Sequence, residues 1–321
     1  MSASPQFPAP EPRESHEGTL LVVGATGHVG THAVRALAGG SRPVRALVRA
    51  STDASWLKAI GVEIAHGDLR QPDSLRAALA NVSTVVCAVT AVHRFMAGDR
   101  TVRIRDVDRA GVRNMVEAAD RAGVERFVFV SLPRLYLSTG CPLVAAAMEA
   151  EDRAVRSRMT TTVVRADPYA ETWLSPEAGF DPMKGAARIY GRGDRPIRFT
   201  STVDIGAAVA RLTAANAPPG DVELAGPEAM TFLEVTAYAE TVTGRPIRRQ
   251  RIPTPVLRLG STVLRSARPE LASVMALAWA LEAATSRVDE SAFTALGIDP
   301  MPVSDYIRSR YGDVPRSAVV S

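Results

Sequence analysis

An apolar run that leads into closely spaced glycines constrains this chain more than any other stretch of its sequence. Residues 20–23 are Leu-Leu-Val-Val, and Gly24, Gly27 and Gly30 follow before helix-forming residues begin at Thr31. This order is typical of a buried strand, a tight turn and a helix start. A phosphate group needs bare backbone N–H groups at close range, and a helix N-terminus adds partial positive charge. The stretch therefore predicts a dinucleotide site.

Apolar runs and amphipathic segments alternate regularly after this first unit. The predicted strands are residues 43–48, 62–65, 84–89, 126–131 and 161–165. The predicted helices are residues 53–60, 73–80, 102–122 and 143–156, and a polar loop through His93 and Arg94 precedes the longest of them. An alternation of this kind predicts an α/β fold with a Rossmann-type doubly wound parallel sheet, covered by helices on both faces.

The second half of the chain has a different character, with glycine, proline and arginine between short elements. The predicted strands here are residues 187–190, 197–200 and 221–225, and the predicted helices are residues 203–215, 231–243 and 271–281. Thr231 is a candidate helix cap because Glu234 follows three residues later. The last of these helices is apolar enough to be buried.

We expect three parts along the chain. Residues 1–17 are rich in proline, serine and glutamate and lack an apolar h-region, so they predict a disordered leader and not a signal peptide. Residues 18–170 are the expected dinucleotide-binding domain, completed by parts of 200–226. Residues 171–321 are expected to be mainly a smaller C-terminal α/β region that binds the substrate.

Composition argues against several classes of protein. The formal net charge is only +4, and the arginines are scattered among acidic residues, which argues against a nucleic-acid surface. Cys87 and Cys141 cannot form a disulfide framework or a metal site and are expected to be buried. The longest apolar run is too short to span a bilayer. We expect a cytoplasmic protein without a membrane partner, and an oligomer is possible.

Several short motifs together resemble the NmrA-like group of atypical short-chain dehydrogenase/reductases. The motifs are Gly-Ala-Thr-Gly-His-Val-Gly at 24–30, Ala-Leu-Val-Arg at 46–49, Gly-Asp-Leu at 67–69, Ala-Gly-Val-Glu-Arg-Phe-Val at 122–128, Thr-Val-Val-Arg at 162–165 and Leu-Ala-Gly-Pro-Glu at 224–228. The resemblance covers about residues 19–312. It implies a Rossmann domain, a small C-terminal substrate domain and a cofactor across the strand ends.

The charge at the end of the second strand favours NADP(H) as the cofactor. An NAD site commonly has Asp or Glu there, whereas this chain has Arg49, with Arg45 on the same strand. A guanidinium can bind a 2′-phosphate bidentately, although a solvated arginine that ends a strand is the alternative. The motifs and the resemblance give the predicted cofactor-binding residues Gly24, Thr26, Gly27, His28, Val29, Arg49, Asp68, Leu69, Ala88, Val89, Thr90 and Ser131.

The usual catalytic signature of the resembled group is missing. Its members commonly carry Tyr-x-x-x-Lys, but no tyrosine here has a lysine four residues later. Where NmrA-like relatives often keep a lysine, this chain has Ala147 or Met148. Tyr136 and His93 are the candidate replacements, since a phenol or an imidazole at the strand ends could relay a proton. A packing aromatic and a solvated histidine are the alternatives.

These features predict an NADPH-dependent oxidoreductase that acts on a small organic substrate in specialised metabolism. A quinone or conjugated carbonyl suits the missing relay, because its reduced product is already a stabilised anion. Two other functions stay open at this point. One is a non-enzymatic NADP(H) sensor that acts through a protein partner, and the other is a non-redox isomerase or lyase on the same fold.

Overall fold

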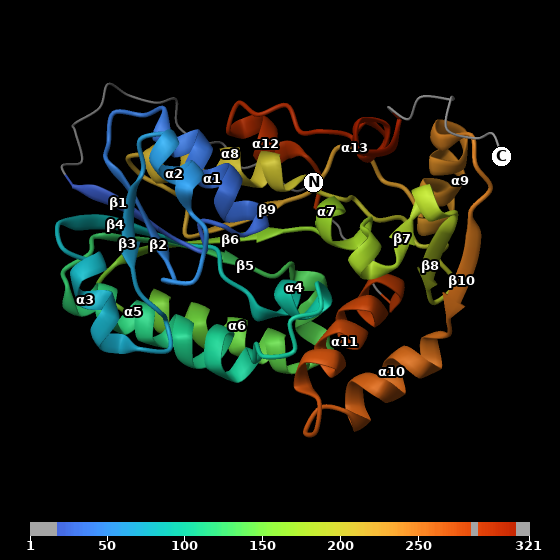
Figure 1. Cartoon of the computed structure of the whole chain (residues 1–321), viewed down its shortest axis with the longest axis horizontal. Coiled ribbons are helices and arrows are strands. Elements are labelled where there is room, and N and C mark those ends of the chain that lie inside the picture. Colours follow the sequence, from blue (N-terminus) through green and yellow to red (C-terminus); the bar gives the residue numbers. More distant parts are fainter. Residues whose placement is uncertain (1–17, 284–287, 313–321) are drawn as a thin grey trace, which may run out of the picture.

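A seven-stranded parallel sheet forms the centre of the computed structural model, which describes residues 18–283 and 288–312 (Figure 1). The strand order β3-β2-β1-β4-β5-β6-β9 confirms the predicted Rossmann-type doubly wound sheet. Its strands are β1 (Thr19–Val23), β2 (Val44–Val48), β3 (Glu63–His66), β4 (Val82–Cys87), β5 (Arg126–Ser131), β6 (Thr160–Ala166) and β9 (Asp221–Leu224). The predicted leader, residues 1–17, lies outside the described residues.

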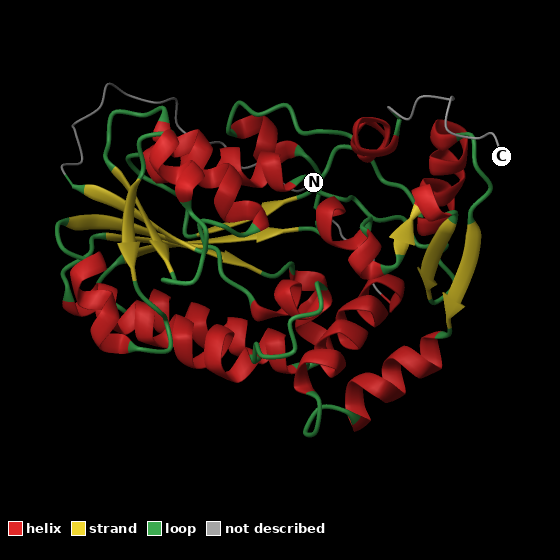
Figure 2. Cartoon of the chain, in the orientation of Figure 1, coloured by secondary structure: helices red, strands yellow, loops and turns green. Residues whose placement is uncertain are grey.

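Helices cover both faces of this sheet, with α1, α8 and α12 on one side and α3, α5 and α6 on the other (Figure 2). The helices are α1 (His28–Ala38), α2 (Ser55–Ala59), α3 (Leu75–Ala78), α4 (Ala91–Met96), α5 (Val112–Arg121), α6 (Pro142–Val155), α7 (Ala170–Trp173), α8 (Thr202–Ala214), α9 (Phe232–Thr243), α10 (Thr254–Val263), α11 (Pro269–Ala283), α12 (Ser291–Ala295) and α13 (Val303–Tyr311). Because both faces are covered, all residues of β1 are buried, which explains its unbroken apolar run.

Helices α1 and α8 pack so closely that one position between them must be glycine. Gly206 of α8 is buried, and a Cβ there would lie 2.5 Å from His32 Cβ and 2.7 Å from Ala33 N. Both distances are far below van der Waals contact, so the two helix backbones meet without a side chain between them. This contact joins α8 from the second half of the chain to the first β-α unit.

A smaller three-stranded sheet lies beside the main one, in the order β10-β8-β7. Its strands are β7 (Phe180–Asp181), β8 (Ala186–Tyr190) and β10 (Arg248–Ile252). Strand β10 has the sequence Arg-Arg-Gln-Arg-Ile and was not predicted, because an exposed edge strand needs no apolar alternation. The capping box at α9 is confirmed, with the Thr231 N–H donating to Glu234 Oε2 at 2.8 Å and the Glu234 N–H donating to Thr231 Oγ1 at 3.0 Å.

Two sequence predictions are corrected in the segments around the strand ends. Residues 197–200 form no strand, and Ile197 and Thr200 make only isolated bridges. The backbone of this segment packs directly against Gly226, where a Cβ would lie 1.9 Å from Phe199 O. This close backbone contact takes the place of a regular strand pairing. The predicted polar loop at His93 and Arg94 is helix α4, which the Thr90 hydroxyl caps by accepting from Val92 N at 3.3 Å.

The predicted long helix at residues 102–122 is present, but its first half is not regular α-helix. Residues Arg105–Gly111 form a π-helical segment, and regular α-helix begins only at Val112. Two local contacts accompany the wider π-helical turn. The Asp108 carboxylate points inward and accepts from the Ala91 N–H, and Gly111 packs against Leu69. Such π-helical segments often occur at functional sites.

Two further expectations concern buried elements. Cys87 and Cys141 are buried free thiols, as expected, and burial raises the pKa of Cys87 to about 12. Helix α11 is largely buried, which confirms the predicted buried helix at residues 271–281. Within residues 18–283 and 288–312, no helix combines the length and the apolar character that crossing a bilayer requires.

The α1–α8 contact gives a prediction about stability. Gly206→Ala should lower the free energy of unfolding by about 1–3 kcal/mol, because the added methyl group has no room between the helices. Gly39→Ala is the matched control, since a Cβ at Gly39 meets no atom within 4 Å and its φ is −80°. The control should be neutral or slightly stabilising. Thermal unfolding of the two variants and wild type tests this, and equal melting temperatures would contradict it.

Candidate functional site

The turn between β1 and α1 is built from backbone contacts that exclude side chains. Gly24 has a φ of 85°, and a Cβ there would lie 2.4 Å from Ala88 O at the end of β4. At Gly30 a Cβ would lie 2.0 Å from Gly24 O. Gly27 begins α1 without a side-chain cap, and the first turn of the helix contains no acidic residue. The free N–H groups of this helix start can therefore bind an anion.

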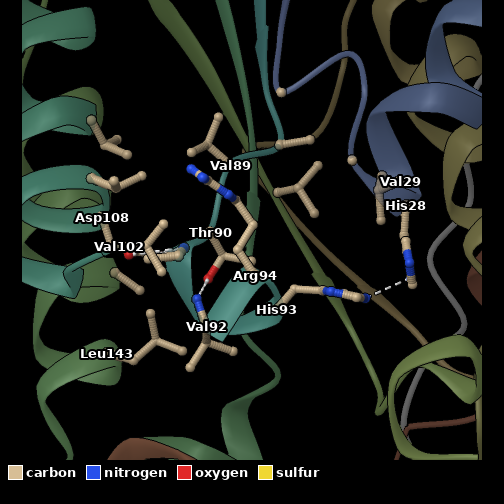
Figure 3. Close-up of a pocket in the computed structure, with 18 of the residues that line it drawn as sticks. His28, Val29, Val89, Thr90, Val92, His93, Arg94, Val102, Asp108 and Leu143 are labelled. Carbon is tan, nitrogen blue, oxygen red and sulfur yellow. Dashed lines mark hydrogen bonds between the residues drawn. The ribbon is translucent and has the colours of Figure 1, made fainter. Parts of the chain in front are cut away.

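A cavity of about 530 Å³ opens from this turn across the carboxyl ends of the central strands. Part of its lining is drawn in Figure 3. All the predicted site residues line it, namely Gly24, Thr26, Gly27, His28, Val29, Arg49, Asp68, Leu69, Ala88, Val89, Thr90, His93, Ser131 and Tyr136. The structure thus brings these residues together, and their individual roles stay predictions.

Arg49 lies directly after β2 and faces the cavity with its charge available. Among the described residues, no hydrogen bond or ion pair engages its guanidinium, and burial, followed by the Arg94 charge, lowers the pKa of Arg49. Arg94 lines the same cavity but pairs with Asp99, so Arg49 is the cation that can accept an anion there. Arg45 differs, because its guanidinium donates to the carbonyls of Ala78 and Ala80 at 2.9 and 2.7 Å and does not line the cavity.

Asp68 is already engaged by a neighbouring cation. Its carboxylate pairs with Arg70, with 2.6 Å between Nη2 and Oδ2, and this hydrogen bond holds the pKa of Asp68 below its usual value. The Asp68 N–H donates to Ser74 Oγ at 2.9 Å, while Asn114 donates to the carbonyl of Leu69 at 2.8 Å. This wall of the cavity is therefore fixed mainly by local hydrogen bonds.

His28 and His93 approach each other across the cavity, one from α1 and one from α4 (Figure 3). His93 Nε2 and His28 Nδ1 are 3.1 Å apart, and the rings meet edge to face. Burial and the neighbouring His93 lower the pKa of His28 to about 4, and burial lowers the pKa of His93. Both rings are therefore neutral near pH 7, so that one donates and the other accepts.

Asp108 is a cavity residue that the sequence analysis missed. It is 5% exposed, and both carboxylate oxygens accept from Ala91 N, at 3.2 and 3.1 Å. Burial raises the pKa of Asp108 to about 7, a rise that the Ala91 N–H and the Thr90 hydroxyl partly oppose. A signal was present in the sequence, because Ile104, Asp108 and Val112 recur at the spacing of one buried helix face.

Two predicted hydroxyl groups are committed to other partners. The Thr90 hydroxyl caps α4, which is the alternative role of a hydroxyl at a strand end. The Ser131 hydroxyl donates to Glu151 of α6, and that carboxylate also accepts from Arg165 Nη1 at 2.8 Å. Ser131 thus belongs to a polar network that joins α6 to the sheet, although it also borders the cavity.

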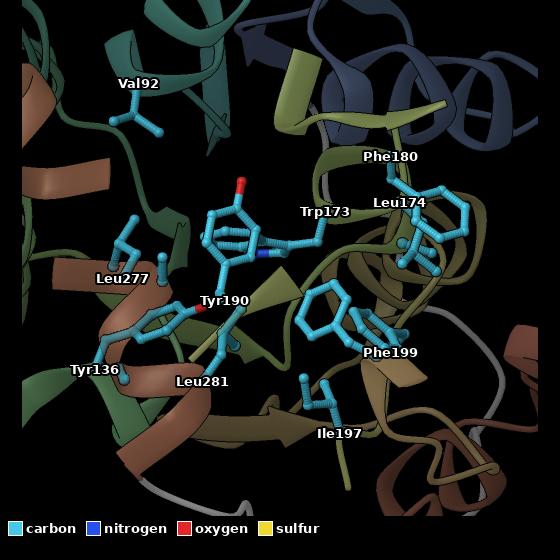
Figure 4. Packing of buried hydrophobic residues seen from close by; sticks show 14 of the residues in the cluster. Val92, Tyr136, Trp173, Leu174, Phe180, Tyr190, Ile197, Phe199, Leu277 and Leu281 are labelled. Atoms are coloured by element: carbon cyan, nitrogen blue, oxygen red, sulfur yellow. The ribbon is translucent and has the colours of Figure 1, made fainter. Parts of the chain in front are cut away.

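The far end of the cavity is mainly apolar, and Tyr136 and Tyr169 are the tyrosines among the described residues that line the cavity. Tyr136 is 3% exposed, and its oxygen makes no hydrogen bond with the described residues. Burial, followed by Asp167, raises the pKa of Tyr136 well above its usual range. Figure 4 shows Tyr136 near Trp173, Tyr190 and Leu277 in the same apolar cluster. A tyrosine with a raised pKa keeps its proton, so it can donate a hydrogen bond but cannot act as a base.

The two residues at which we expect the relatives' lysine to fall lie in different surroundings. Ala147 of α6 lines the cavity, whereas the neighbouring Met148 is 48% exposed on the surface. Neither a methyl group in the cavity nor a thioether on the surface can hold a ribose or lower the pKa of a tyrosine.

Comparison with known proteins agrees with this geometry. The profile of the NmrA-like family matches residues 16–263. The photosystem II assembly factor Ycf39 of Synechocystis is 27% identical over 308 residues, with 92% of this chain and 91% of that protein covered. The NAD(P)H azoreductase of Xenophilus azovorans is 29% identical over 235 residues, with 71% of this chain and 75% of that protein covered.

A solved structure has the same fold. The NADPH-dependent quinone oxidoreductase QOR2 of Escherichia coli, solved with NADPH, superposes with a TM-score of 0.71. It is 21% identical, with 91% of this chain and 99% of that chain covered. At this identity the likeness establishes a shared fold.

The buried Asp108 gives a prediction about pH. Its pKa rises on folding from its ordinary value of 3.8 to about 7, so the folded state holds the proton more tightly. The stability that this proton contributes is fully present below pH 3.8 and is lost as the pH rises from 3.8 to about 7. Asp108→Asn should therefore gain stability relative to wild type between about pH 4.5 and about pH 8. Denaturant unfolding at both pH values measures this gain.

The control is Asp106→Asn, on the same segment, where the carboxylate is half-exposed and pairs with Arg105 at 3.3 Å. This control should follow wild type across the range. A stability difference between Asp108→Asn and wild type that is constant with pH would contradict the raised pKa.

Proposed function

Because the chain belongs to the NmrA-like family, we propose that it is an NADPH-dependent oxidoreductase that reduces a small organic substrate, such as a quinone or a conjugated carbonyl. The observation that carries this proposal is the Arg49 guanidinium, which faces the cavity without a hydrogen-bond partner among the described residues. A buried or half-buried cation without a partner is costly to the protein, and a phosphate monoester in the same cavity would satisfy it.

The residues around the glycine turn fit the pyrophosphate and the 2′-phosphate of NADP(H). The N–H groups at the start of α1 would hold the pyrophosphate, and the missing side chains at Gly24 and Gly27 leave it room. Arg49 would hold the 2′-phosphate, where an NAD site commonly has an acid. NADPH supplies a hydride when it is bound. The NADPH-bound structure of the quinone oxidoreductase supports this assignment through its shared fold.

The apolar end of the cavity suits a flat substrate with little charge. Trp173, Leu143 and Leu277 supply apolar walls, and the Tyr136 hydroxyl is the donor that can reach a substrate oxygen. Without a lysine at position 147, Tyr136 keeps its proton and can orient and polarise a carbonyl. A substrate whose reduced anion is already stabilised needs only this hydrogen bond and correct placement beside the cofactor, and no proton relay. We assign the substrate region mainly to residues 171–321, with Tyr136 and Leu143 added.

A regulatory role without turnover is the second candidate. The similarity to the photosystem II assembly factor extends over nearly the whole length of both chains. Ala147 in the place of a lysine also removes the ammonium group that would lower the pKa of a catalytic tyrosine. An NADP(H)-binding protein of this kind would act through a protein partner. Steady oxidation of NADPH with a panel of quinones supports the enzyme, and tight NADPH binding without turnover on any quinone supports the regulator.

Arg49→Asp tests the cofactor. A charged hydrogen bond contributes about 1.5–3 kcal/mol, so NADPH should bind about one to two orders of magnitude more weakly, with a further loss from repulsion. NADH affinity should be unchanged or improved, since the new carboxylate can accept from the ribose hydroxyls. The loss for NADPH should shrink as salt rises. Calorimetric titration with both cofactors gives these affinities.

The matched control is Arg76→Asp, an equal change of charge on the exposed face of α3, outside the cavity. It should leave both affinities unchanged. Equal losses for NADPH and NADH in Arg49→Asp, or a wild type that prefers NADH, would overturn the assignment of NADP(H).

Tyr136→Phe tests the proton donor. Turnover of a water-soluble quinone should fall on the order of a hundredfold, while NADPH affinity stays the same. The free energy of unfolding should not decrease, because the hydroxyl makes no hydrogen bond in the fold. Tyr190→Phe is the control, since its buried hydroxyl donates to Ala178 O at 2.6 Å outside the cavity. It should cost about 1 kcal/mol of stability and leave turnover unchanged. Unchanged turnover in Tyr136→Phe would remove this tyrosine from the reaction.

A further inference from the structure

Helix α10 lies at the outer edge of the molecule (Figure 1), and it presents an apolar stripe to solvent. Val256, Leu259 and Val263 are 50%, 65% and 66% exposed, and their spacing of three and four residues places them on one helix face. Large exposed aliphatic side chains are uncommon on a soluble surface, and a group of three on one face points to a partner.

The inner side of α10 is fixed firmly to α11. Leu257 and Ser261 are buried, and a Cβ at Gly260 would lie 2.1 Å from the Met275 methyl group. The Arg258 guanidinium lies over the Trp279 ring, 5.8 Å from its centroid. Because the helix is held on this side, the apolar stripe cannot turn inward and stays exposed.

A block of arginines lies in the segment of the chain that contains this stripe, before, within and after α10. Between positions 245 and 268 the sequence contains no acidic residue and the seven arginines Arg245, Arg248, Arg249, Arg251, Arg258, Arg265 and Arg268. The expected scatter of arginines among acids is therefore wrong for this segment. In the part of the chain that the structure describes, only one of the seven forms an ion pair, Arg249 with Glu240 at 2.8 Å. The segment thus keeps most of its positive charge for an external partner.

We propose that α10 and the arginines beside it dock onto an anionic lipid surface. The aliphatic stripe would enter the boundary between headgroups and acyl chains, and the arginines would contact lipid phosphates. A nucleic acid fits less well, because binding of single strands uses aromatic side chains for stacking and residues 245–268 contain none. The proposal concerns the membrane surface and needs no spanning helix.

Flotation of the full chain with lipid vesicles tests this proposal. Wild type should float with vesicles of equal parts phosphatidylcholine and phosphatidylglycerol. With vesicles of phosphatidylcholine alone, it should remain in the bottom fraction of the gradient. The double variant Leu259→Gln/Val263→Gln should lose binding on the order of tenfold or more. Arg265→Gln/Arg268→Gln, at two exposed arginines that follow α10, should lose a similar factor, and its remaining binding should respond less to salt.

The matched control is Val155→Gln/Arg156→Gln at the end of α6, where Val155 is 62% exposed and Arg156 pairs with Asp152. It should float like wild type. Thermal unfolding and NADPH affinity should be the same in all variants, which separates this test from that of the proposed function. The proposal is overturned if wild type does not float, if the control loses binding equally, if an oligonucleotide competes as well as lipid, or if Leu259 instead controls a monomer–dimer equilibrium in sedimentation.

Discussion

The direct contact between the first turn and the end of β4 is the constraint on which the site depends. Because a Cβ at Gly24 would lie 2.4 Å from Ala88 O, the β1–α1 turn and the residues after β4 cannot separate without losing their packing. This contact occurs where the strand order reverses, between β1 and β4. A crevice forms there because the connections that follow β1 and β4 run to opposite faces of the sheet. Gly30 extends the same contact and fixes where α1 begins.

Buried polar groups hold the walls of this cavity in position. Arg165 is nearly fully buried and bonds Glu151 and Asp221, and Glu151 also accepts from the Ser131 hydroxyl. One guanidinium thereby ties α6 and β9 to the central strands. A buried ion pair of this kind adds little net stability but fixes geometry, because removal of either partner leaves an uncompensated charge. Asp108 has a comparable role at the start of α4, where it satisfies a backbone N–H.

Local patterns in the sequence predicted the central sheet and the residues around the glycine turn. Gly24, Gly27 and Arg49 could be predicted because their positions follow from a strand and a turn within a few residues. Asp108 was missed although its spacing from Ile104 and Val112 indicated a buried face, because its bond to Ala91 N depends on the π-helical turn, which the sequence pattern does not show. Strand β10 was missed because an exposed edge strand shows no apolar pattern. The free Tyr136 hydroxyl and the Ser131–Glu151 bond depend on tertiary packing, which periodicity does not encode.

Helix α11 belongs to two surfaces at once, and this has a thermodynamic consequence. It contributes Val274 and Leu277 to the cavity, and it supports α10 through Met275 and Trp279. Any ligand that shifts α11 from within the cavity changes the position of α10 as well. Coupling free energies are reciprocal, so such a ligand and an occupant of the outer face of α10 would change each other's affinity by the same factor. Through α11, occupancy of the cavity and occupancy of the outer face of α10 would then depend on each other.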